Sequence, residues 1–178
     1  LNKYSSRVVM ANIAQTVNVL QSLCLTGGEK MILTPTYHVY NLYKPHLGSF
    51  ALKVEVQSPI IKEPSPTPAT PRLPVRKLKP LQALDASASL REDGKSLFIT
   101  LVNQSLDEDL EAEIRLVGGK EVERGALSIV GAEDVRDHNN FDALNKVIPH
   151  ERPVKMKGKT QNYVVPKHSI NGLVLSLR

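Results

Sequence analysis

The sequence of 178 residues has little cysteine and little aromatic character: one cysteine, Cys24, no tryptophan, and eight phenylalanine and tyrosine residues in all. A single thiol excludes an internal disulfide, a Cys-rich zinc site and an iron–sulfur cluster. No apolar run approaches the ~20 residues that a membrane span requires, so we expect a soluble protein. The first residue is Leu1 rather than methionine, and we expect the sequence to be a segment of a longer protein.

Histidines and glycines also fall short of the known site patterns. The five histidines are scattered through the sequence, and none forms the HExxH or i,i+4 pair that places two imidazoles around a metal. Gly27-Gly28 and Gly118-Gly119 lack the spacing of phosphate-binding loops and are interpreted as turns. The sequence therefore predicts no metal and no cofactor.

Prolines and aromatic residues divide the chain. Five of the eight aromatic residues lie within the first 50 positions, and seven of the twelve prolines lie between Pro59 and Pro80. Proline lacks an amide donor and has a fixed φ, which excludes a helix or an interior strand there. We therefore expect one domain portion at 1–50, a second domain at 51–178, and a Pro-rich basic connector or loop at 59–80.

The pattern before the connector is helical. Apolar residues recur at spacings of four and three from Ser6 to Leu23, which predicts a helix that Cys24 follows as a small buried hydrophobe. A turn at 26–28 and a short apolar run, Lys30–Thr34, come next, and the run is typical of a buried parallel strand. A further helix is predicted over Pro35–His46, because proline suits the first helical turn.

The pattern after the connector has a period of two. Two alternating runs flank Asp93-Gly94, a dipeptide that favours a tight hairpin. Further strands are predicted over Glu111–Val117, over Ala126–Val130 and in the terminal run that contains Leu173. Many short strands separated by polar turns are typical of an antiparallel β-sandwich. The predicted fold class is mainly β.

The net charge of +5 arises from two short basic stretches of the sequence. The stretches 59–80 and 146–159 each contain five basic residues and one acidic residue, a net charge of +4, and both are interpreted as solvated loops. Nucleic-acid binding would require aromatic residues among the basic ones or a recognition helix, and Tyr163 is the one candidate near either stretch. We expect no nucleic-acid partner, and an anionic polysaccharide or an acidic neighbouring subunit stays open.

Several long strings resemble one enzyme family. The strings VVMANIAQTVNVLQ, GEKMILTPTYHVYNLYKPH, HNNFDALNKVIP and VPKHSINGLVLSL are very similar to the C-terminal part of the α-L-arabinofuranosidases of glycoside hydrolase family 51. The resemblance covers nearly the whole chain apart from the insert at 62–79. It implies the end of a (β/α)₈ barrel followed by a jelly-roll-like β-sandwich.

On this resemblance, Lys30–Thr34 is the eighth barrel strand, and Thr34, Thr36 and Tyr37 lie at the rim where such barrels bind substrate. Some relatives carry a glutamine near the position of Thr34. A role of Thr34 in capping the following helix is an equal alternative. These three residues are the candidate substrate-binding residues, and no catalytic residue is assigned in this chain.

The resemblance implies retaining hydrolysis of terminal non-reducing α-L-arabinofuranosyl groups in arabinan, arabinoxylan and related arabinosides. That reaction uses two carboxyl groups ~5–5.5 Å apart. In the family both are barrel glutamates upstream of Leu1, so the chain alone is expected to be inactive, and residues 1–46 are expected to be poorly ordered or prone to aggregate without the missing N-terminal barrel portion.

The expected partners are that N-terminal portion, an arabinose-containing oligo- or polysaccharide, and further copies in a homo-oligomer. The lack of disulfides suits a bacterial cytoplasmic enzyme, with secretion left open. Two rival functions stay open: a β-sandwich module that binds carbohydrate without cleaving it, and a basic interaction module.

Overall fold

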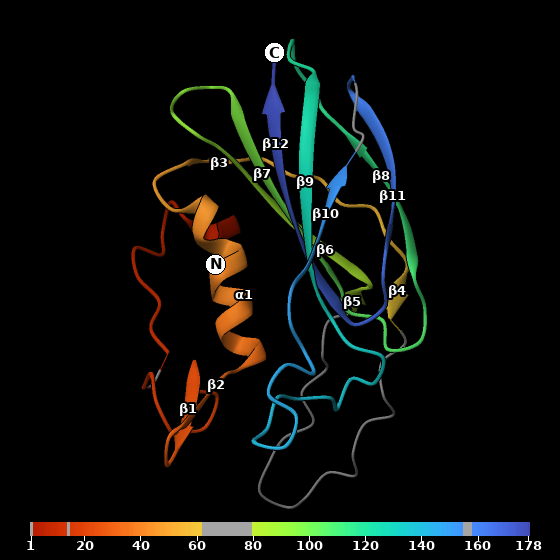
Figure 1. Cartoon of the computed structure of the whole chain (residues 1–178). Coiled ribbons are helices and arrows are strands. Elements are labelled where there is room, and N and C mark those ends of the chain that lie inside the picture. The colour runs from red at the N-terminus through yellow and green to blue at the C-terminus, as the bar shows by residue number, and fades with distance from the viewer. Residues whose placement is uncertain (1, 14, 62–79, 155–157) are drawn as a thin grey trace, which may run out of the picture.

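The computed structural model describes residues 2–13, 15–61, 80–154 and 158–178 (Figure 1). Most of the Pro-rich connector predicted at 59–80 lies outside these residues. The described part contains one α-helix, two 3-10 turns and twelve strands. The helix is α1 (Pro35–Tyr43), the 3-10 turns are Asn2–Tyr4 and Lys44–His46, and the strands are β1 (Cys24–Gly27), β2 (Lys30–Leu33), β3 (Phe50–Leu52), β4 (Ile60–Ile61), β5 (Leu81–Gln82), β6 (Leu84–Leu90), β7 (Ser96–Asn103), β8 (Leu110–Arg115), β9 (Val122–Val130), β10 (His150–Val154), β11 (Thr160–Val165) and β12 (Ser169–Leu177).

Six of the strands form one antiparallel sheet in the order β10-β9-β12-β7-β6-β3. The hairpin predicted at Asp93-Gly94 is confirmed: it joins β6 to β7, with Leu90 opposite Leu97. Gly94 has a φ of +62°, which a residue without a side chain adopts at low cost. The Asp93 carboxylate accepts hydrogen bonds from the backbone N–H groups of Lys95 and Ser96 and closes the turn. The predicted fold class, mainly β with antiparallel strands, is confirmed.

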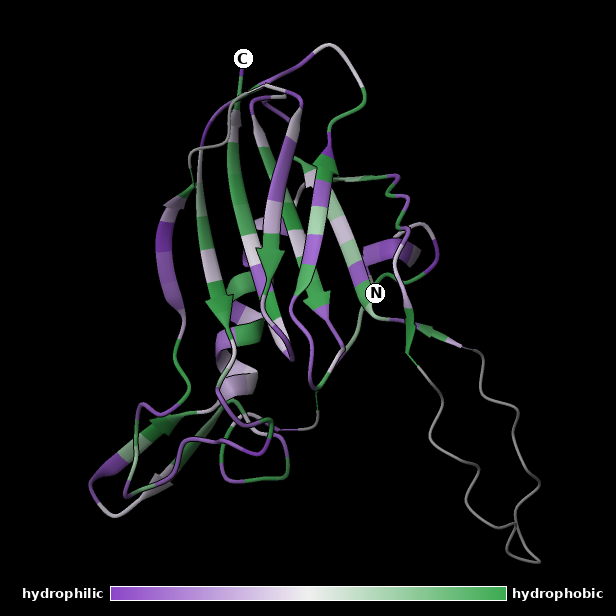
Figure 2. Ribbon diagram, turned by 90° about the vertical axis from the view of Figure 1, so that its right-hand side faces the viewer, coloured by the Kyte–Doolittle hydropathy of each residue, from purple (hydrophilic) through white to green (hydrophobic). Residues whose placement is uncertain are grey.

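The hydrophobic core lies on one face of this sheet. Successive strand residues point to opposite faces, so the alternate residues of β7 and β12 share this side. The two-stranded sheet of β8 and β11 covers it with Ala112 and Val165. Figure 1 shows these two strands as a separate layer beside the large sheet, and Figure 2 shows hydrophobic positions along the strands of the large sheet. The buried members of the core are Leu84, Ala86, Leu97, Ile99, Leu101, Ala112, Val122, Leu127, Val165, Leu173 and Leu175.

Helix α1 lies against the opposite face of the sheet (Figure 1). The side chain of Leu42 rests on Gly172 of β12, where an added Cβ would lie 2.7 Å from the Leu42 Cγ. This face is polar for a covered one: Ser87, Ser89 and Thr100 lie on it. The helix predicted over Pro35–His46 is confirmed, with its last three residues in a 3-10 turn.

The helix predicted over Ser6–Leu23 is wrong. Apart from Ala14, this segment is an irregular chain of turns and extended residues. Little of the predicted apolar stripe is covered in the described part of the chain: Val9 is 99% exposed and Leu20 is 88% exposed. Most helical stability in proteins comes from the packing of such a stripe, so periodicity alone does not form the helix.

The parallel strand predicted over Lys30–Thr34 is corrected as well. β2 pairs antiparallel with β1 across the turn at Gly28 and Glu29, and Ile32 is its one buried residue. Cys24 therefore begins a strand and is half-buried, whereas the sequence predicted a small buried hydrophobe at the end of a helix. An apolar run shows that a segment is a strand but does not show its partner.

The basic stretch 146–159 is a loop only in part. Strand β10 runs through it and pairs with β9 at the edge of the large sheet. β11 was not predicted either, and it pairs with β8 along its whole length. Within the described residues, no helix is long and apolar enough to cross a membrane.

Candidate functional site

The three candidate rim residues lie at the junction of β2 and α1. Thr34 is the N-cap of the helix, and its Oγ1 accepts a hydrogen bond of 3.3 Å from the backbone N–H of Tyr37. The same hydroxyl donates to the carbonyl oxygen of Ser22 at 2.7 Å. Both functions of the hydroxyl are therefore engaged within the chain, and the capping role considered for Thr34 is present in the structure.

Thr36 and Tyr37 lie in the first turn of α1 and are half-buried. The ring of Tyr37 meets the ring of His38 edge to face, with 5.5 Å between the ring centroids. The neutral hydroxyl groups of Thr36 and Tyr37 can both donate and accept hydrogen bonds, as can the hydroxyl groups of a sugar. The structure thus brings the three candidate residues together on one short segment.

A loop that is distant in sequence contacts the junction of β2 and α1. The side chain of Asn139, in the long connection between β9 and β10, donates a hydrogen bond of 2.8 Å to the carbonyl oxygen of Leu33. Leu33 is the last residue of β2 and precedes Thr34. Sequence reasoning missed Asn139, because a single asparagine in a polar loop gives no signal of a contact 106 residues away.

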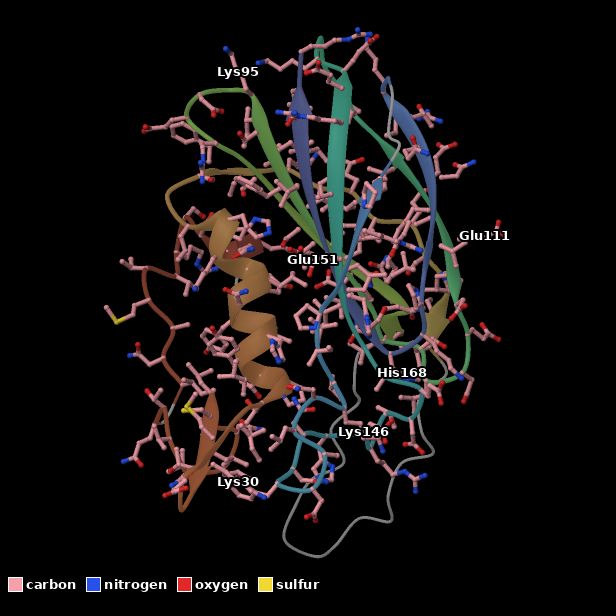
Figure 3. The ribbon with its side chains drawn as sticks, in the orientation of Figure 1. Lys30, Lys95, Glu111, Lys146, Glu151 and His168 are labelled. Carbon is pink, nitrogen blue, oxygen red and sulfur yellow. The ribbon has the colours of Figure 1, made fainter. Side chains whose placement is uncertain are left out.

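A cavity of about 150 Å³ lies between α1 and the sheet. Polar side chains that line it include His38 from α1, Ser128 from β9 and Glu151 from β10, whose position beside the helix is labelled in Figure 3. His38 is 8% exposed, and its buried Nε2 has no hydrogen-bond partner among the described residues. Burial also lowers the pKa of His38, so the neutral imidazole is favoured there.

His46 joins the helix region to the sheet. Its Nδ1 lies 2.7 Å from Ser89 Oγ and its Nε2 lies 2.7 Å from Thr100 Oγ1. A neutral imidazole has one donor and one acceptor, and each hydroxyl can serve either of them. Tyr43 and Phe98 flank the ring. Burial lowers the pKa of His46 below its ordinary value, so the folded chain favours the uncharged ring.

We expect acid to loosen α1 from the sheet. The pKa of His46 is lowered in the folded state, so the unfolded chain binds the proton more readily and stability is lost as the pH falls below the unfolded value of 6.5. Hydrogen exchange of the α1 amides, measured from pH 7.5 to 5.5, should show falling protection. The variant His46→Gln should flatten part of this dependence, and the exposed His138→Gln should leave it unchanged. Constant protection in the wild-type chain would contradict the prediction.

Side chains that could bind a metal ion are not clustered in the described part of the chain. No group of three or more histidine, cysteine, aspartate or glutamate side chains there could hold a metal ion. The segment from Thr34 to Tyr37 contains no carboxylate, and Glu29 lies in the turn at the opposite end of β2. The segment from Thr34 to Tyr37 therefore offers hydroxyl groups but no carboxylate.

The fold is that of the C-terminal region of family 51 glycoside hydrolases, as solved structures show. A family 51 arabinofuranosidase from Xanthomonas axonopodis pv. citri superposes with a TM-score of 0.82 at 32% identity, over 98% of this chain and 32% of that one. An α-L-arabinofuranosidase from Thermotoga maritima, solved as an arabinose complex, gives a TM-score of 0.79 at 26% identity, over 98% of this chain and 35% of that one.

The family follows from the sequence comparison. The model of the α-L-arabinofuranosidase C-terminal domain matches residues 1–169, and the chain belongs to this family. It is 34% identical over 175 residues to an intracellular exo-α-L-arabinofuranosidase of Bacteroides ovatus, a match that covers 98% of this chain and 31% of the relative. A probable α-L-arabinofuranosidase C of Aspergillus clavatus is 30% identical over 93% of this chain and 30% of its own length. The chain thus spans about a third of these relatives.

Proposed function

We propose that this chain is the C-terminal portion of a retaining α-L-arabinofuranosidase that releases terminal non-reducing α-L-arabinofuranosyl groups from arabinan, arabinoxylan and related arabinosides. The observation that carries the proposal is the match of the C-terminal domain family over residues 1–169 in a chain that spans about a third of its relatives. The portion that would precede it supplies the catalytic glutamate pair, and the chain without that portion is inactive.

Within the complete enzyme, residues 1–50 form the end of the catalytic barrel and residues 51–178 form the sandwich domain. α1 is then the last barrel helix, and β2 is the last barrel strand, which would exchange the antiparallel partner β1 of this chain for parallel neighbours in the barrel. Apolar side chains near the N-terminus, among them Val9, Met10 and Leu20, are exposed. This supports a protein partner for residues 1–50, because burying apolar surface against the rest of the barrel would stabilise the protein by about 25 cal/mol per Å².

Thr36 and Tyr37 are the residues that we propose contact the sugar, with Thr34 in support. The hydroxyl of Thr34 is held by the Ser22 carbonyl oxygen, and so its first effect is on the shape of the rim. In barrels of this class the substrate lies at the C-terminal ends of the strands, where this junction would lie. Assembly into a homo-oligomer and an intracellular location, the latter named for the Bacteroides relative, complete the proposal.

The test compares this chain with the protein expressed from its complete coding sequence. Both are incubated with 4-nitrophenyl α-L-arabinofuranoside, and release of 4-nitrophenol is measured, with the matching β-D-xyloside as the substrate control. We expect the complete protein to cleave the arabinoside and the isolated chain to release nothing above background. A complete protein that cleaves neither substrate contradicts the proposal, as does an isolated chain that turns over.

A further inference from the structure

The connection between β9 and β10, residues 131–149, docks onto the β1–β2 hairpin, and Figures 1 and 2 show the two segments side by side. Phe141 lies over Gly27 of β1 so closely that an added Cβ there would lie 2.9 Å from the Phe141 ring. Figure 3 shows Lys146 of this docking loop and Lys30 of the hairpin in the same lower region of the molecule. Segments more than 100 residues apart therefore form one structural unit at this end.

Asn139 makes the polar part of that contact. It is 4% exposed and uses both ends of its amide. Its Nδ2 donates to the carbonyl oxygens of Leu33 at 2.8 Å and Val147 at 2.9 Å, and its Oδ1 accepts from the backbone N–H of Val147 at 2.7 Å. Of these three hydrogen bonds of Asn139, the one to Leu33 leaves the docking loop, and Leu33 is the last residue of β2.

The peptide group between Leu33 and Thr34 is held by hydrogen bonds at both its carbonyl and its N–H. The Leu33 carbonyl is held by Asn139, and the next residue, Thr34, donates its backbone N–H to the Leu23 carbonyl at 3.0 Å and its hydroxyl to Ser22. The peptide that enters α1 is therefore fixed before the helix begins. Thr36 and Tyr37 follow within one turn, so a change in that peptide moves both.

We propose that Asn139 is a positioning residue of the substrate site: through the Leu33 carbonyl it sets the entry of α1 and hence the placement of Thr36 and Tyr37 against the sugar. The inference rests on the proposed function and extends it, because it gives a loop of the sandwich portion a part in shaping the pocket of the barrel. Asn139 itself does not touch the sugar.

The chemistry of the amide explains why an asparagine stands here. Two carbonyl oxygens and one N–H converge on the side chain, which requires two donors and one acceptor on a short, rigid group. A carboxylate at this position has no donor and would face two buried carbonyl oxygens. A leucine of similar size fills the space and leaves all three backbone groups unpaired.

The experiment uses the complete enzyme and the variants Asn139→Ala and Asn140→Ala. Asn140 lies in the same docking loop, and its Oδ1 accepts bonds from the backbone of Asp142 and Ala143 without reaching Leu33. We measure kcat and KM on 4-nitrophenyl α-L-arabinofuranoside together with the midpoint of thermal unfolding. Contacts that hold the sugar equally in the bound state and in the transition state act on KM rather than on kcat. Asn139→Ala should lower kcat/KM by about 10-fold or more, with most of the change in KM.

Asn140→Ala should lower the unfolding midpoint and keep kcat/KM within about twofold of the wild type, because it weakens the loop alone. The inference is overturned if Asn139→Ala lowers the midpoint and leaves KM unchanged, or if both variants raise KM equally. A wild-type enzyme without arabinofuranosidase activity would overturn the proposed function, and this inference with it, whereas an active enzyme insensitive to Asn139→Ala overturns the inference alone.

Discussion

Replacement of Leu173 by alanine is expected to lower the free energy of unfolding by about 3 kcal/mol. Leu173 is 1% exposed and lies at the centre of β12, the strand that pairs with both β7 and β9. Truncation removes the buried methyl groups and leaves a cavity that close-packed neighbours such as Leu127 and Ile99 fill only in part. Urea denaturation followed by circular dichroism measures the loss.

The matched control is Val174→Ala. Val174 is the next residue on the same strand, points to the opposite face and is 44% exposed, so the variant should cost about 1 kcal/mol or less. Equal losses for the two variants would show that the core does not lie on the side of β12 that the structure gives it.

Replacement of Asn103 by alanine is expected to cost about 2–3 kcal/mol. The residue ends β7, is 2% exposed, and donates from Nδ2 to the carbonyl oxygens of Glu108 at 2.9 Å and Val165 at 3.0 Å. Its Oδ1 accepts from the backbone N–H of Ser105 at 2.9 Å. Alanine leaves three backbone groups without this partner and removes the polar link between the large sheet and β11.

Gln104→Ala provides the comparison for Asn103. Gln104 is the adjacent residue and is exposed, and its Nε2 donates to the Gln82 carbonyl at 3.1 Å on the surface. Loss of that bond should change the free energy of unfolding by about 0.5 kcal/mol or less. If both variants unfold at the same urea concentration as the wild type, Asn103 does not link the two layers.

Local signals in the sequence were enough for much of the sheet. The period-two runs on either side of Asp93-Gly94 specified β6 and β7, because alternation and a turn dipeptide act within a few residues. The alternate leucines around Leu173 identified β12 in the same way. The proline after Thr34 correctly indicated the start of α1.

The errors arise where long-range contacts decide. The segment Ser6–Leu23 has a helical period, but the period specifies a helix only when something covers its apolar side. β10 was missed because Pro153 and three charged or polar residues leave it without alternating apolar and polar positions. A strand at the edge of a sheet tolerates such a sequence, including the proline. β2 was recognised as a strand, but its antiparallel partner β1 was missed, because Cys24–Gly27 was divided between the residue after the predicted helix and the predicted turn at 26–28.

The candidate site shows the same division. The N-cap role of Thr34 follows from its place before Pro35 and could be predicted. The hydrogen bond of the buried Asn139 amide could not be predicted, because it joins two segments that are distant in sequence. Family resemblance indicated the string that contains Asn139, but the string does not show which of its residues reaches β2.

The two edge strands of the large sheet, β3 and β10, affect the tendency of the protein to aggregate through strand pairing. β3 is three residues long, and β10 carries Pro153, which offers no amide hydrogen to an incoming strand. Neither margin is a good template for a foreign β-strand. Fibrillar growth by addition of strands to the large sheet is thereby disfavoured at both of its margins.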